Sequence, residues 1–145
     1  MKYYQAILLC FCCVGMVSCK QDGIKGLVPC SGVVLKNGQS VEEVSITFIP
    51  IDATSESKTA NGRTNVNGQF TATTQKWNGI LPGKYKITLT KRIPQVNPGQ
   101  ESVPESYRTV THVEQMGKYA KADQSGLTIE IPKSGDKDLK IEIQE

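Results

Sequence analysis

The sequence of 145 residues is poor in the side chains that most often carry out catalysis. It contains one histidine, His112, and one tryptophan, Trp77, and aromatic residues make up 6% of the chain. Catalysis by a serine, histidine and aspartate triad would have to use His112 as its base, because the chain offers no other imidazole. A lone histidine in a polar loop is far more often a bystander than a base. The sequence therefore disfavours an enzyme.

The chain also lacks a block or stripe of basic residues. Lysine and arginine together number 17, aspartate and glutamate number 14, and the formal net charge is +3. Proteins that bind nucleic acids usually concentrate basic residues on one face or along one segment. Nucleic acid is therefore not an expected partner.

Cysteine is scarce after residue 19, where only Cys30 remains. The other four lie in the stretch LLCFCCVGMVSCK, at Cys10, Cys12, Cys13 and Cys19. A metal or redox cluster would need more ligands further along the chain, and only Cys30 and His112 are there. We therefore expect no metal and no cofactor. A lone cysteine such as Cys30 is usually buried and inert.

No apolar run is long enough to cross a membrane. Residues 6–17, AILLCFCCVGMV, form a run of twelve residues, whereas a spanning helix needs about 20. The length of this run and the positive charge of Lys2 before it are typical of a secretory signal peptide. The cysteines within it then count as small hydrophobic residues.

The residues MVSC, at positions 16–19, resemble a bacterial lipobox. That motif has an apolar residue, two small or modest residues and an invariant cysteine, and Met16 stands where leucine is usual. The resemblance implies cleavage between Ser18 and Cys19, and lipid attached to Cys19. Two or three acyl chains hold a protein firmly on a membrane, so we expect an exported protein anchored by lipid. An ordinary signal peptide cleaved nearby is the alternative.

This resemblance and the strand pattern of the remaining chain together divide the sequence into three parts. Residues 1–18 are expected to be the signal peptide, 19–26 the lipidated N-terminus and tether, and 27–145 a single β-sandwich domain of common size. Lys20 is not the aspartate that retains lipoproteins in the inner membrane of some Gram-negative bacteria. By that analogy the outer membrane is favoured over the inner membrane.

Beyond the tether the hydrophobic period is two, which is typical of strands with one buried face. The alternating stretches are VSITFI, QFTAT, YKITLTK, LTIEI and LKIEI, after a first strand whose phase is mixed around Gly32. The absence of a long helical pattern predicts an all-β fold with two packed antiparallel sheets. The residues predicted for its core are Val44, Ile46, Phe48, Phe70, Ile87, Leu89, Leu127, Ile129, Leu139 and Ile141.

Turn signals separate these stretches. They are the pairs Asn37-Gly38, Asn67-Gly68 and Pro82-Gly83. Each pair is typical of a tight turn, and Gly83 is predicted to have a positive φ. Tyr85 opens the next strand on its inward face, so its hydroxyl is predicted to find a polar partner.

Residues 92–125 form a stretch that is long for a loop. We expect it to be either a functional excursion or a meandering edge. A weak capping box at residues 111–114 is compatible with one short helix there.

The segments also stand in the order of a known family. SGVVLKNGQSVEEVSITFIP resembles the first hairpin of transthyretin-like, carboxypeptidase-regulatory-like domains of bacterial lipoproteins. GRTNVNGQF, GILPGKYKITL and the closing strands are similar to later segments of that family. The resemblance covers about Val28 to Ile143 and implies a seven-stranded Greek-key β-sandwich. Relatives that open a purine-derived ring carry several histidines and a C-terminal Y-R-G-S, which this chain lacks.

Two small clusters offer alternative sites. The turn NVNG has amide oxygens but no carboxylate nearby, and Asn65 replaces the aspartate usual in the family, so a turn is favoured over a calcium site. Glu130 and Glu142 lie on solvent faces of strands that look adjacent, which would allow a carboxylate pair. Outward glutamates are ordinary on such strands, and the sequence indicates no cleft around them.

We therefore expect a non-catalytic module with a structural or recognition role at the cell envelope, with an envelope protein or a polysaccharide as candidate partner. The alternative is a carbohydrate- or polymer-binding module that uses the loop around Trp77 and the 92–125 excursion. Trp77 is the candidate ligand contact. An envelope enzyme is disfavoured, and we assign no catalytic residue.

Overall fold

The structure is a computed structural model that describes residues 23–52, 54, 57–96, 99, 102–104, 110–114 and 116–144. The expected signal peptide, the cleavage site at Ser18 and Cys19, and the first residues of the tether lie outside this part of the chain.

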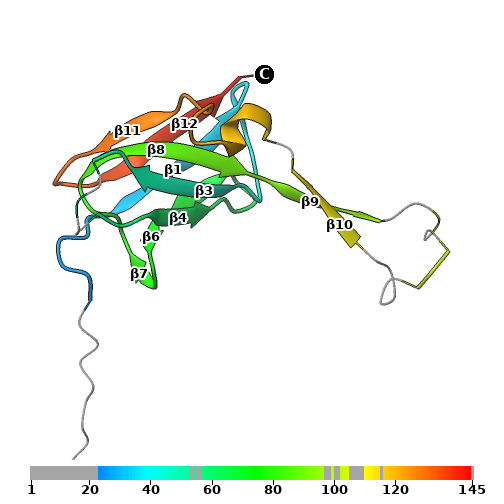
Figure 1. The fold of residues 1–145 in the computed structure, drawn as a ribbon, viewed down its shortest axis with the longest axis horizontal. Helices are drawn as coiled ribbons and strands as arrows, with labels where there is room; N and C mark the ends of the chain where they lie inside the picture. Colours follow the sequence, from blue (N-terminus) through cyan, green and yellow to red (C-terminus); the bar gives the residue numbers. More distant parts are fainter. Residues whose placement is uncertain are drawn as a thin grey trace, which may run out of the picture.

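The described chain is all-β and its two main sheets enclose one hydrophobic core, consistent with a β-sandwich (Figure 1). The first sheet contains β1 (Cys30–Lys36), β2 (Gln39–Ser40), β5 (Gln69–Thr71) and β12 (Asp136–Ile143). Its order is β12-β1-β2, and β5 also pairs with β1. The second sheet has the order β11-β8-β3-β4-β6-β7. Its strands are β3 (Ser45–Pro50), β4 (Ala60–Arg63), β6 (Thr73–Thr74), β7 (Trp77–Asn78), β8 (Gly83–Thr90) and β11 (Thr128–Ile131).

A two-stranded ribbon leaves this sandwich where β8 ends. It consists of β9 (Arg92–Val96) and β10 (Val110–Glu114), which pair antiparallel with each other. Figure 1 shows the ribbon extending away from the two main sheets. It is therefore an excursion and not an edge of either sheet. The capping box at residues 111–114 lies within β10, and the short 3₁₀ helix η2 (Gly117–Ala120) follows it.

The core lies between the two main sheets, as the alternation predicts. Eight of the ten predicted residues are buried, and Leu127 and Ile129 are partly buried against them. The Phe48 ring of the second sheet lies 6.0 Å from the Phe70 ring of the first, measured between centroids. It also meets the buried Tyr85 ring edge-on at 6.4 Å. This aromatic cluster joins the two sheets.

The prediction of wholly antiparallel sheets was wrong for one pair of strands. β1 and β12 run parallel. The reason is that residues 132–135 return the chain to the end of the sandwich where β1 begins, and Asp136 N donates a hydrogen bond to Pro29 O at 2.9 Å. Turn signals fix the relative direction of consecutive strands only, and these two strands are the first and the last.

The mixed phase around Gly32 has a structural cause. The register between β1 and β12 shifts between Cys30 and Gly32. A Cβ on Gly32 would lie 1.9 Å from the backbone oxygen of Leu139, a separation too short for any side chain to occupy this position. The sequence thus has glycine at a point where the two backbones approach too closely for a Cβ.

The stretch QFTAT, predicted as one strand, is divided between the two sheets. β5 pairs with β1 in the first sheet, whereas β6 pairs with β4 in the second. Ala72 lies between them, is fully buried, and donates its amide hydrogen to Cys30 O at 2.8 Å. The chain thus crosses from one sheet to the other at Ala72.

Candidate functional site

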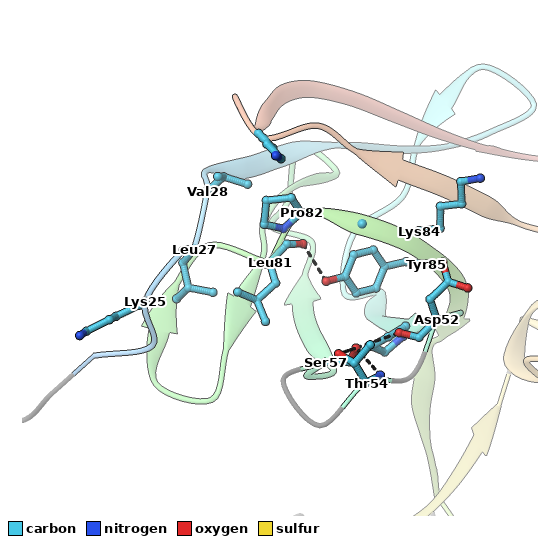
Figure 2. A pocket seen from close by; sticks show the side chains of 14 residues that line it. Lys25, Leu27, Val28, Asp52, Thr54, Ser57, Leu81, Pro82, Lys84 and Tyr85 are labelled. Atoms are coloured by element: carbon cyan, nitrogen blue, oxygen red, sulfur yellow. Dashed lines mark hydrogen bonds between the residues drawn. The ribbon is translucent and has the colours of Figure 1, made fainter.

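The tether end of the sandwich, formed by residues 23–28, 50–52, 54, 75–84 and 132–137, contains a groove of about 680 Å³. Figure 2 shows the side chains that line it. The walls come from the segment that enters β1, the loop after β3 and the turn before β8, and Lys133 adds a fourth element. These segments are far apart in sequence, and the sandwich brings them together.

The turn before β8 forms one wall of the groove and is held by Tyr85. The Tyr85 hydroxyl donates a hydrogen bond of 2.7 Å to Leu81 O (Figure 2). This is the polar partner that the sequence predicts for Tyr85. Gly83 has a φ of +147°, a value in the positive region predicted for it. Burial, and to a lesser degree the nearby Cys30, raises the pKa of Tyr85, so the hydroxyl stays a donor.

The loop after β3 folds around the hydroxyl of Ser57. Ser57 Oγ donates to Asp52 O at 2.9 Å and accepts from Thr54 N at 2.9 Å. Ile51 N donates to Lys84 O at 2.9 Å, which ties the loop to β8. The two hydroxyls of this wall, on Thr54 and Ser57, also contact each other at 3.0 Å.

The groove is apolar in its middle and positive at its rim. Leu27, Leu81 and Tyr85 supply apolar surface. Three exposed lysines, Lys25, Lys84 and Lys133, face one aspartate, Asp52, so the charged residues of the lining sum to 3 − 1 = +2. In Figure 2, Lys25 and Lys84 lie on opposite sides of the groove. This arrangement suits a ligand with an apolar body and a negative group.

The groove offers binding groups and no catalytic set among the described residues that line it. It contains no histidine, and Asp52 is its single carboxylate. His112 belongs to β10, in the ribbon that leaves the sandwich. Among the described residues, no group of three or more histidine, cysteine, aspartate or glutamate side chains is placed to hold a metal ion.

The predicted turn residues lie where strands connect. Asn37 and Gly38 have φ values of +50° and +79° and join β1 to β2, whose residues Lys36 and Gln39 pair. Gly68 has a φ of +72° just before β5. The Asn65 side-chain oxygen accepts hydrogen bonds from Asn67 N at 2.9 Å and Gln69 N at 3.0 Å. Its oxygen thus caps the turn.

The prediction that Glu130 and Glu142 lie on adjacent strands was wrong. β11 lies in the second sheet and β12 in the first, and both glutamates are exposed. The two stretches look adjacent only because they are consecutive in sequence. The turn between them crosses from one sheet to the other.

Trp77 lies outside the groove, on the hairpin of β6 and β7. It is half-buried, and the Lys76 ammonium lies 5.4 Å from its ring centroid. Tyr85 and Tyr119 are buried, and Tyr107 lies outside the described residues. Among the residues that the structure describes, no aromatic row therefore surrounds Trp77.

Sequence reasoning did not identify the lysines of the groove. Lys25 looks like part of a tether, Lys84 like an ordinary outward strand residue, and Lys133 like part of a turn. The sequence around each lysine does not indicate that they lie together, because only the packing of the two sheets brings them to one rim of the groove.

Cys30 is buried and forms no disulfide. Burial raises the pKa of its thiol to about 11, with a smaller contribution from the negative charge of Asp136. A thiol with so high a pKa is almost wholly protonated near neutral pH and hence a poor nucleophile.

Comparison of the chain with models of protein families, with curated proteins and with solved structures finds no match. Within the described part of the chain, no helix has the length and apolar composition that crossing a bilayer requires.

Proposed function

We propose that this protein is an exported, lipid-anchored and non-catalytic β-sandwich module that recognises a partner at the cell envelope. The sequence MVSC at 16–19 carries the proposal, because it ends an apolar run at a cysteine and is followed by polar residues. Described structure begins at Gly23, four residues after Cys19. The anchor would therefore hold the sandwich close to a membrane.

We further propose that the fold is the seven-stranded Greek-key sandwich of transthyretin-like domains. With the two-residue strands β2, β6 and β7 set aside, the main sheets hold β1, β3, β4, β5, β8, β11 and β12, which are seven strands. This count and the order of the sequence segments support the proposal. An experimental structure with a different strand order would contradict it.

The groove at the tether end is the candidate recognition site. Its volume of about 680 Å³ lies within the range of small-molecule sites. Its lining sums to a charge of +2. A pull-down from solubilised envelope should recover less partner with Lys84→Glu than with the wild type. Lys121→Glu, which changes an exposed lysine beside η2, is the matched control. Equal recovery with both variants would place recognition elsewhere.

The anchor itself is tested by the intact mass of the protein purified from membranes. We expect a chain that begins at Cys19 and carries acyl groups, and fractionation should place it in the outer membrane. Cys19→Ala should abolish acylation and leave uncut precursor or released protein. Residues 1–18 still attached to the membrane form, or a free thiol on Cys19, would contradict the proposal.

Carbohydrate binding is the second candidate, and the exposed part of Trp77 is the observation that favours it. Sugars stack on exposed aromatic rings, and the neighbouring lysine would suit an acidic polymer. Binding of envelope polysaccharide that is lost in Trp77→Ala, in a protein with unchanged stability, would support this role over recognition by the groove.

A further inference from the structure

The tether end carries the chain's single tryptophan on a projecting hairpin. β6 and β7 pair through Thr74 and Trp77, and Gln75 between them has a φ of +57°. Lys76 is exposed at the tip, with its ammonium 5.4 Å from the Trp77 ring centroid. A half-buried tryptophan beside an exposed lysine is a combination suited to the headgroup layer of a membrane, where the ring is partly apolar and partly wet.

The hairpin lies against the first described residues of the chain. A methyl group on Gly23 would lie 3.8 Å from the atoms of the Trp77 ring, and Val28 pairs with Ile80 just after the hairpin. Figure 1 shows the N-terminal segment and the hairpin on the same side of the sandwich. Three residues separate Gly23 from Cys19, so four steps along the chain place their Cα atoms at most about 14 Å apart.

The charge of this end is positive at its surface. Lys25 and Lys133 border the groove, Lys76 stands at the hairpin tip, and Lys137 borders a small hollow shared with Asn78. All four lysines are exposed, as is the single carboxylate of the groove lining, Asp52, so these five charges sum to +3. The half-buried Asp136 of the same end lies beside Cys30 and raises that thiol's pKa. Lysines near an anionic membrane surface each strengthen binding about fivefold.

We propose that the tether end rests on the phospholipid surface, with Trp77 in the headgroup layer and Lys25, Lys76 and Lys133 against anionic phosphates. The inference rests on the proposed anchor at Cys19, which brings Gly23 to the membrane. It goes further, because an anchor alone would let the sandwich take any orientation. The short link and the positive charge favour a lipid surface over a protein as the occupant of the hairpin side of this end. Lys84, across the groove from Lys25 (Figure 2), is left to the partner that the groove recognises.

The experiment uses the lipidated full-length protein in vesicles of phosphatidylcholine that contain phosphatidylglycerol. Since Trp77 is the only tryptophan, its fluorescence reports the hairpin alone. Brominated phosphatidylcholine should quench this emission. Acrylamide, which stays in the water, should quench the vesicle-bound protein less than the same protein in detergent. Vesicles without phosphatidylglycerol should lose most of the lipid quenching.

Charge variants test the role of the lysines. Lys76→Gln with Lys133→Gln should lower the ratio of docked to undocked protein about 25-fold, at about fivefold for each lysine. Lys121→Gln, beside η2, should leave the ratio unchanged. Circular dichroism checks that each variant is folded.

The outcomes separate this inference from the proposed anchor. If the protein carries acyl groups and floats with vesicles, but brominated lipid does not quench Trp77, the inference is overturned and the proposed anchor is supported. Protein without acyl groups that fails to float overturns both. Protection of Trp77 by a soluble polysaccharide, with no quenching by brominated lipid, overturns the inference in favour of sugar binding.

Discussion

The core lies between the strands of the two sheets, whereas the tether end is built mostly from segments that connect strands, and different constraints act on their residues. In the core, Ile46, Phe48 and Leu89 are almost completely buried and fill space between neighbours. At the tether end, Lys25, Lys84 and Lys133 are exposed, and they contribute through the charge that they place at the rim of the groove. Changes in the core should therefore alter stability, and changes at the tether end should alter binding.

The largest expected effect is in the core. Phe48→Ala removes the ring that joins Phe70 to Tyr85, and should lower the free energy of unfolding by about 3–5 kcal/mol. Urea denaturation measures the loss. Val66→Ala is the control, because Val66 is 78% exposed and its truncation should change stability by less than about 0.5 kcal/mol. An unchanged midpoint for Phe48→Ala would show that the core is not where we place it.

Gly32→Ala should have the next largest effect, at about 1–3 kcal/mol. The new methyl group would meet the Leu139 backbone oxygen, and that oxygen can move only if the pairing of β1 with β12 is disturbed. Gly38→Asn is the control: open space surrounds Gly38, and asparagine tolerates its positive φ at a cost below about 1 kcal/mol. Equal stabilities of the two variants would mean that the close approach does not constrain the fold.

Alkaline pH should weaken the core through Cys30. The pKa of this thiol is about 11 in the folded chain against an ordinary value of 9.0, so the unfolded chain loses the proton first. The stabilisation is complete below pH 9 and declines as the pH rises towards 11. The urea midpoint should fall across this window. The fall should be smaller in Cys30→Ala, in which the raised pKa of Tyr85 still contributes.

Tyr85→Phe links the two regions. It keeps the buried ring but removes the hydrogen bond to Leu81 O, which should cost about 0.5–1.5 kcal/mol. Because this bond holds one wall of the groove, recovery of the envelope partner should also fall. Tyr119→Phe is the matched control, since the Tyr119 hydroxyl bonds Gln144 O at the opposite end of the sandwich. Partner recovery that falls equally in both variants would point to general destabilisation.

The smallest effect on stability is expected at the rim of the groove. Lys84→Gln removes one exposed charge and should change the free energy of unfolding by less than about 0.5 kcal/mol. The same change should still reduce partner recovery. If Lys84→Gln lost much stability but still bound the partner, the distinction between a stabilising core and a binding tether end would be contradicted.

The sequence predicts the core well because burial follows the alternation of side chains along a strand. Phe48 and Ile87 could be placed from their own neighbours, and Tyr85 could even be given a polar partner. The parallel pairing of β1 with β12, and the sheet change at Ala72, depend on contacts between distant segments. The rim of Lys25, Lys84 and Lys133 depends on them too, so no local pattern could reveal it.

The parallel pairing of β1 with β12 has a mechanical consequence. β1 begins at the tether end, and β12 finishes at the opposite end beside Lys36. Force applied between an N-terminal attachment and the C-terminus would pull these neighbouring strands in opposite directions along their length. The backbone hydrogen bonds from Gly32 and Leu139 to Lys36 and Ile143 would then resist sliding together instead of breaking one after another. A chain joined in this way should be stiff under tension, and its forced unfolding should begin only when this whole ladder gives way.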